Sequence, residues 1–79
     1  MKLLMTPVNV LTNEKGHPSG LNGPRKPVAV RRVLDFWRDG GGWWRGEPPR
    51  DYYLLEVETG TVLEVYRAGE TWVLSRVAD

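Results

Sequence analysis

The residues of this chain that are best suited to chemistry or binding lie together in its middle third. Three of the four tryptophans fall between positions 37 and 44, and two tyrosines follow at positions 52 and 53. A tryptophan ring must be buried or stacked while its N–H finds an acceptor. In a chain of 79 residues, such a cluster predicts either the centre of a very small core or an aromatic recognition surface.

Groups that could perform covalent or metal-assisted catalysis are scarce. His17 is the only histidine and cysteine is absent, which excludes disulfides, thiolate metal sites and cysteine nucleophiles. The carboxylates at 39, 47 and 51 would suit paired acid and base roles, but the arginines at 38, 45 and 50 interleave with them and favour simple ion pairing. The sequence therefore predicts a protein that is not an enzyme, with no catalytic residue, no metal and no cofactor.

Aromatic side chains in the cluster are better candidates for binding. If Trp43 and Trp44 lie on a strand, they point to opposite faces, so that one enters the core and the other stays near solvent beside Arg45. An exposed tryptophan there would stack on a base or anchor a partner protein. The alternative is that both rings are covered, one by the core and the other by arginine stems or by the prolines at 48 and 49.

Basic residues are concentrated in the first half of the chain. Residues 1–38 carry a net charge of +5 and residues 39–79 carry −4, which together give the net +1 of the whole chain. The two halves either pair with each other or leave a basic face for single-stranded nucleic acid, and the nearly neutral total ranks a protein partner first. The candidate binding residues for either partner are Arg31, Arg32, Trp44, Arg45 and Tyr52.

The elements that must position these residues are predicted to be strands. Three runs rich in β-branched and aromatic residues, at 52–58, 62–67 and 72–77, are separated by glycine-containing turns and predict a three-stranded meander. Alternation places Tyr53, Leu55 and Val57 on one face of the first strand, and it places Leu74 opposite Val77 on the last. Neither face is polar throughout, which is typical of a curled sheet or a small barrel.

Upstream segments are less regular. Residues 27–37 predict a strand with a bulge near Arg32, and a helix over 30–38 is the competing interpretation. Residues 8–12 predict a first strand that ends in a turn at 13–16. Residues 13–26 are a candidate mobile loop, in which 18–25 would alternatively form a poor edge strand, and residues 47–50 predict a rigid connector.

These elements predict one all-β domain spanning residues 1–79. It would be a small, strongly curved antiparallel sheet or partly open barrel of five or six strands, with the aromatic cluster in its interior. The N-terminus is too short for a signal-peptide core and no apolar run approaches about 18 residues, so we expect a cytoplasmic protein without membrane contact. A strand edge left unpaired would favour a homodimer.

Residues 27–79 also resemble a known group of sequences. The tandem tryptophan at 43–44, followed at 50–53 by Arg-Asp-Tyr-Tyr, is the most specific part, and Glu-Val-Tyr at 64–66 and Trp72 add to it. This pattern resembles a small uncharacterised bacterial domain family of free-standing short proteins. It also resembles the C-terminal module of actinobacterial accessory proteins similar to inactive Y-family translesion DNA polymerases. Ala78 replaces an aromatic residue of that pattern. The resemblance implies an all-β accessory module linked to DNA damage tolerance, without an established catalytic residue.

Overall fold

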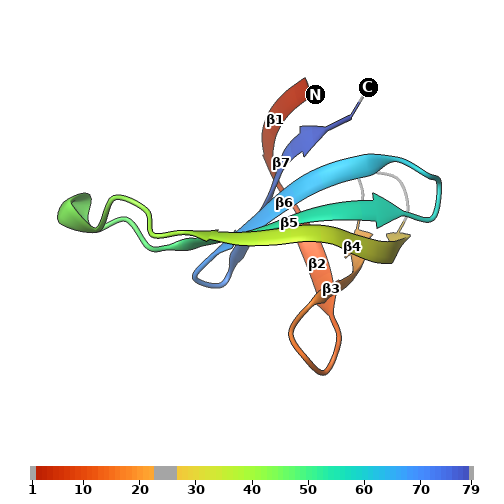
Figure 1. Ribbon diagram of the computed structural model, residues 1–79, viewed down its shortest axis with the longest axis horizontal. Coiled ribbons are helices and arrows are strands. Elements are labelled where there is room, and N and C mark those ends of the chain that lie inside the picture. The colour runs from red at the N-terminus through yellow and green to blue at the C-terminus, as the bar shows by residue number, and fades with distance from the viewer. Residues whose placement is uncertain (1, 23–26, 79) are drawn as a thin grey trace.

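The structure is a computed structural model that describes residues 2–22 and 27–78, with side chains except at 2–4 and 43. Its strands form one antiparallel sheet in the order β1-β7-β6-β5-β4-β3-β2 (Figure 1). The strands are β1 (Lys2–Pro7), β2 (Asn9–Thr12), β3 (Pro18–Asn22), β4 (Pro27–Asp39), β5 (Arg50–Val57), β6 (Val62–Ala68) and β7 (Thr71–Val77). A single turn of 3-10 helix, η1 (Trp43–Arg45), lies between β4 and β5. The all-β prediction is confirmed, with seven strands in place of five or six.

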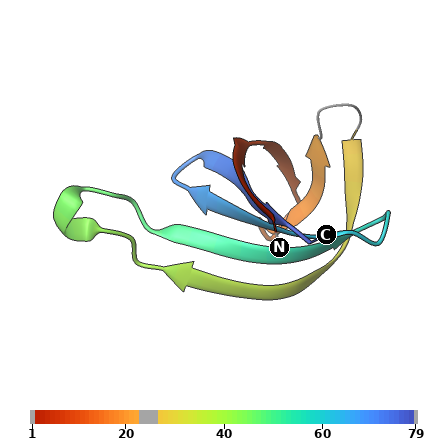
Figure 2. The ribbon, with the colours of Figure 1, turned by 90° about the horizontal axis from the view of Figure 1, so that it is seen from above.

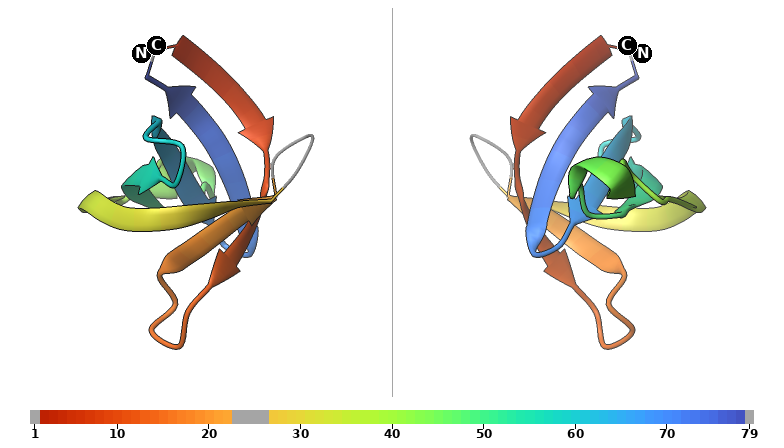
Figure 3. Two further views of the ribbon diagram at one scale, coloured as in Figure 1. Left: turned by 90° about the vertical axis from the view of Figure 1, so that its right-hand side faces the viewer. Right: turned by 90° about the vertical axis from the view of Figure 1, so that its left-hand side faces the viewer.

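The sheet curls strongly because its two end strands are neighbours in the chain. β1 and β2 are joined through Val8, yet they stand at opposite ends of the strand order. The backbone N–H of Val8 donates to the carbonyl oxygen of Trp72 at 3.1 Å. Figure 3 shows β1 and most of β7 on one side of the plane of β4, and β2 and β3 on the other. The predicted curvature is therefore confirmed.

Two segments differ from the sequence prediction. β1 was not expected as a strand, and it pairs with the C-terminal strand β7. Residues 18–22 are neither a loop nor an edge, because β3 lies between β2 and β4. The turn before β3 is formed as predicted, with the side-chain oxygen of Asn13 accepting from the backbone N–H groups of Lys15 and His17 at 2.9 and 3.0 Å. Residues 23–26 of the predicted loop lie outside the described residues.

The predicted meander is confirmed as β5, β6 and β7, with one correction to its faces. The register between β6 and β7 shifts between Glu64 and Val65, so that Ser75 has no partner opposite it. This bulge turns Val77 to the same side as Leu74, and both pack against the core. Strict alternation had placed them on opposite faces, and that prediction is wrong.

The core is built mainly from aliphatic residues of β5 and β6. Leu55 and Val65 are fully buried, and the remaining core positions are Leu21, Tyr53, Val57 and Leu63. Tyr53 of the aromatic cluster lies in this interior, but Phe36, Trp37 and Trp44 are exposed, so the prediction that the cluster fills the interior is wrong for these three. Phe36 and Trp37 lie near the C-terminal end of β4, and Trp44 lies in the loop between β4 and β5. This end of β4 and the loop extend past the curled part of the sheet (Figure 1).

β4 is a strand with two bulges. Its register with β5 shifts between Val30 and Arg32 and again between Val33 and Asp35, which leaves Arg31 and Leu34 without a partner opposite. The predicted bulge near Arg32 is therefore confirmed. The helical alternative is wrong, because the pairing with β5 continues through Asp39.

Candidate functional site

The outer edge of β4 is open along most of its length. β3 pairs only with Pro27–Ala29, so residues 31–39 have β5 on one side and no described strand on the other. Figure 2 shows this part of β4 as the outermost strand, running toward the loop that carries η1. An edge of this length presents unpaired backbone groups to any extended chain that approaches it.

Large apolar side chains gather on the same open segment. Seven large hydrophobic side chains are exposed among the described residues, and four of them lie here: Val33 (38%), Leu34 (44%), Phe36 (49%) and Trp37 (38%). Phe36 lies on the face of Tyr53, with ring centroids 4.9 Å apart, and Trp37 lies on the opposite face with Tyr52. Both faces of this edge strand are therefore apolar and open to solvent.

The edge also carries features that limit non-specific pairing. The bulges at Arg31 and Leu34 interrupt it, and the N–H of Phe36 donates to the carboxylate of Asp35 at 2.8 Å. Bulges and charged side chains are the usual means by which proteins protect an edge strand from aggregation. The regular part of the edge is therefore short, from Asp35 to Asp39.

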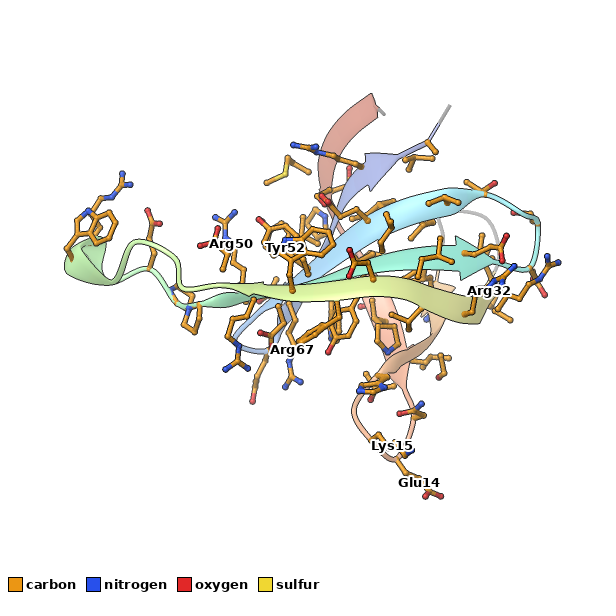
Figure 4. The ribbon with its side chains drawn as sticks, in the orientation of Figure 1. Glu14, Lys15, Arg32, Arg50, Tyr52 and Arg67 are labelled. Carbon is orange, nitrogen blue, oxygen red and sulfur yellow. The ribbon has the colours of Figure 1, made fainter. Side chains whose placement is uncertain are left out.

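A row of rings crosses β4, β5 and β6 on the face opposite the core. Trp37 stacks on Tyr52 with centroids 5.4 Å apart, and Tyr52 contacts Tyr66 at 5.2 Å. The Arg50 guanidinium lies over the Tyr66 ring at 4.7 Å, and its Nη1 donates to the Tyr52 hydroxyl at 3.4 Å. This hydrogen bond raises the pKa of Arg50 above its usual value. Figure 4 shows Arg50 and Tyr52 on one side of the sheet and Arg67 on the other.

Two adjacent hollows open beside this row. The first, of about 310 Å³, is lined by Met5, Trp37, Asp39, Arg50, Tyr52, Glu64, Ser75 and Arg76. The second, of about 280 Å³, is lined by Asp39, Gly41, Gly42, Trp44, Arg45, Glu47 and Arg50. Asp39 and Arg50, which face each other across β4 and β5, line both hollows.

A third and larger hollow of about 690 Å³ lies where β1 passes into β2. Among the described residues that line it, Trp72 supplies the only aromatic ring and Glu70 the only charged side chain.

The loop between β4 and β5 presents Trp44 to solvent. Trp43 and Trp44 lie in η1 and not on a strand, so the condition for their pointing to opposite strand faces is not met. The alternative that both rings are covered is wrong, because Trp44 is exposed. The N–H of Arg45 donates to the carbonyl of Gly42 at 2.7 Å, which closes the turn and leaves Trp44 66% exposed. The Arg45 guanidinium lies 5.9 Å from the Trp44 ring centre.

The structure brings together three of the five predicted binding residues. Trp44, Arg45 and Tyr52 line the two hollows. Arg31 and Arg32 lie toward the opposite end of β4, where Arg32 is labelled in Figure 4. Arg31 donates to the carbonyl of Glu58 at 2.9 Å, and Arg32 pairs with Glu56 at 2.6 Å.

Trp37 and Arg50 were not among the predicted site residues. Both residues line the first hollow because the β4–β5 register sets Trp37 opposite Tyr52 and Asp39 opposite Arg50. The two bulges decide that register, and the sequence indicated only one of them.

The carboxylates near the tryptophans are largely engaged by their own chain. Asp51 pairs with Arg38 at 2.7 Å and Glu47 lies 3.8 Å from Arg45, so ion pairing is confirmed for these two. Asp39 accepts the N–H of Gly41 at 2.9 Å instead. Residues 2–22 and 27–78 contain no group of three metal-ligating side chains and no helix that could cross a membrane.

Comparisons with protein-family models, with curated proteins and with solved structures find no match to this chain.

Proposed function

We propose that this protein is a non-enzymatic interaction module that binds a partner protein by adding a strand to the open edge of β4. The observation that supports this proposal is the coincidence of the unpaired edge at 31–39 with four exposed apolar side chains. An added strand would satisfy the backbone groups of β4 and would cover Phe36 on one face and Trp37 on the other. Each large aromatic ring can remove about 150–250 Å² from water when it is covered.

The charges near the open β4 edge favour a protein partner over a polyanion such as nucleic acid. Arg32 and Arg38 pair with Glu56 and Asp51 on β5, so neither is left without a carboxylate. An apolar edge whose arginines already have partners gains more from burying surface than from attracting phosphate.

The experiment is an affinity capture with three forms of the full chain. Leu34→Lys places a charge on the edge, and Leu11→Lys makes the same change at a side chain that is 56% exposed on β2. A partner that binds β4 is retained by the wild type and by Leu11→Lys, and it is lost with Leu34→Lys. Retention of every captured protein by Leu34→Lys contradicts the proposal.

Two further measurements define how such a partner binds. Hydrogen exchange at the amides of residues 35–39 should slow when the partner is bound, because a new strand protects them. Sedimentation of the wild type alone tests the predicted homodimer. Self-association that Leu34→Lys abolishes would identify the added strand as a second copy of β4.

A further inference from the structure

Arg50 is a cation that two tyrosines hold in place. It is half-buried, its guanidinium lies on Tyr66, and Tyr52 accepts its hydrogen bond. Within residues 2–22 and 27–78, no carboxylate lies within 4.0 Å of it, whereas Arg45 and Arg76, which line the same hollows, each have one at 3.8 Å. A guanidinium that is partly removed from water and held in place is prepared to bind an anion.

Flat rings line both of the hollows beside this cation. Trp37, stacked on Tyr52, lines the first hollow, and Trp44 lines the second. Arg50 lines both hollows, so a guanidinium is shared by a hollow that contains the Trp37 ring and a hollow that contains the Trp44 ring. A single strand of nucleic acid has the complementary set of base, phosphate and base.

Two of the three carboxylates that line the two hollows lie near arginines other than Arg50. Glu64 is buried, accepts the Ser75 hydroxyl at 2.6 Å and lies 3.8 Å from Arg76. Glu47 accepts the Gly42 N–H at 3.2 Å, and Asp39 accepts that of Gly41. Glu64 and Glu47 therefore each have an arginine within 4.0 Å, whereas Asp39, which faces Arg50 across the two strands, has the hydrogen bond from Gly41 and no arginine within 4.0 Å among the described residues.

We infer that the two hollows form a site for a short stretch of single-stranded nucleic acid, about two nucleotides long. One base stacks on Trp37, the next stacks on Trp44, and the phosphate between them accepts hydrogen bonds from Arg50. This site shares Trp37 with the strand addition proposed above, but its ligand lies over β4, β5 and the η1 loop, whereas an added strand would pair with the backbone of the open β4 edge.

The test is an anisotropy titration of a labelled eight-nucleotide oligothymidylate with the full chain, at about 20 mM and about 150 mM salt. We expect saturable binding at low salt. The logarithm of the affinity should fall with the logarithm of salt with a slope of about −0.7 to −2, because single strands give about −0.7 for each phosphate contact and three arginines line the site. No binding at the lower salt overturns the inference.

Arg67 provides a matched control for Arg50. Its guanidinium also lies over a ring, that of Trp72 at 5.9 Å, but on the opposite face of the sheet (Figure 4). Arg50→Gln should weaken binding at least tenfold and reduce the salt slope by about 0.7. Arg67→Gln should bind as the wild type does. Equal affinity of the two variants overturns the inference.

Additional variants keep the result decisive if Arg50→Gln is poorly folded. Trp44→Ala changes an exposed side chain and should weaken binding at least fivefold while the thermal midpoint is unchanged. Leu34→Lys should bind the oligonucleotide no more weakly than the wild type, which separates this site from the β4 edge. A glutamate octapeptide should not compete. Competition equal to that of unlabelled oligothymidylate would assign the anion to a peptide and overturn the inference.

Discussion

The ring of Trp37 stacks on the ring of Tyr52 across the β4–β5 pair, with centroids 5.4 Å apart and planes within 2° of parallel. This contact joins the open edge of β4 to the row of rings that ends at Tyr66. The two surfaces to which we assign binding therefore share one structural element, and the stack between them can be tested by itself.

Trp37→Leu and Tyr52→Leu should show coupled effects on stability. Each variant alone loses the stack, so the double variant should be more stable than the sum of the two losses predicts. The expected coupling is about 0.5–1.5 kcal/mol. The measurement is the free energy of unfolding in urea for all four forms. Effects that add to within about 0.3 kcal/mol would show that the stack contributes nothing to the stability of the fold.

Ser75 is expected to be important because it is the hydroxyl partner of a buried carboxylate. Its Oγ donates to Glu64 Oε2 at 2.6 Å, and both residues are buried. Ser75→Ala should therefore lower the free energy of unfolding by about 1–3 kcal/mol. Ser19→Ala, which removes an exposed hydroxyl that bonds the carbonyl of Leu11, should change it by less than about 0.5 kcal/mol. Similar losses of unfolding free energy in the two variants would show that burial of the Ser75 hydroxyl does not strengthen its contribution to stability.

Gly41 and Gly40 are adjacent, yet they should respond differently to alanine. Gly41 has a φ of +69°, and a Cβ there would lie 2.6 Å from the carbonyl oxygen of Pro48. At Gly40 a Cβ would meet no described atom within 4 Å. Gly41→Ala should therefore destabilise the protein by about 1–3 kcal/mol and shift the tryptophan emission of the loop. Gly40→Ala should do neither, and equal behaviour would show that the loop conformation differs from the one described.

The Arg32–Glu56 pair predicts a dependence of stability on acid. The hydrogen bond from Arg32 holds the pKa of Glu56 below its usual value. The folded state therefore favours the charged carboxylate, so the stabilisation is present above the usual pKa of about 4.3 and is lost as the pH falls through the lower folded value. The free energy of unfolding, measured in urea at pH 7, 4.5 and 3, should decrease less toward acid pH in Glu56→Gln than in the wild type. Parallel curves for the two forms would contradict this assignment.

Three runs of β-branched and aromatic residues, separated by glycine-containing turns, were enough to predict the meander from the sequence. Residues 52–57 alternate without interruption, and their two faces are those that the structure shows. The bulge near Arg32 was also predictable, because two adjacent arginines break the alternation there. Local patterns of this kind carry their own signal, since each residue's face depends only on its neighbours in the strand.

Long-range pairing was not predictable in the same way. The strand at Lys2–Pro7 has no alternation of its own and is defined by its pairing with β7. The bulge at Ser75 is visible only when β6 and β7 are aligned, and the one at Leu34 only against β5. Register is a property of two strands together, so one strand's sequence does not fix it when apolar residues lie on both faces.

The sequence by itself determined that this chain is a curved all-β domain with a cluster of aromatic residues near its middle, but it predicted that this cluster would lie in the interior. Only the tertiary structure decided that Arg31 and Arg32 lie away from Trp44, that Trp37 and Arg50 join Tyr52, and that β4 has an open edge. The physical reason is the curl of the sheet. The chain must pass from one end of the sheet to the other at Val8, which confines β3 to the first residues of β4 and leaves the rest of that strand uncovered.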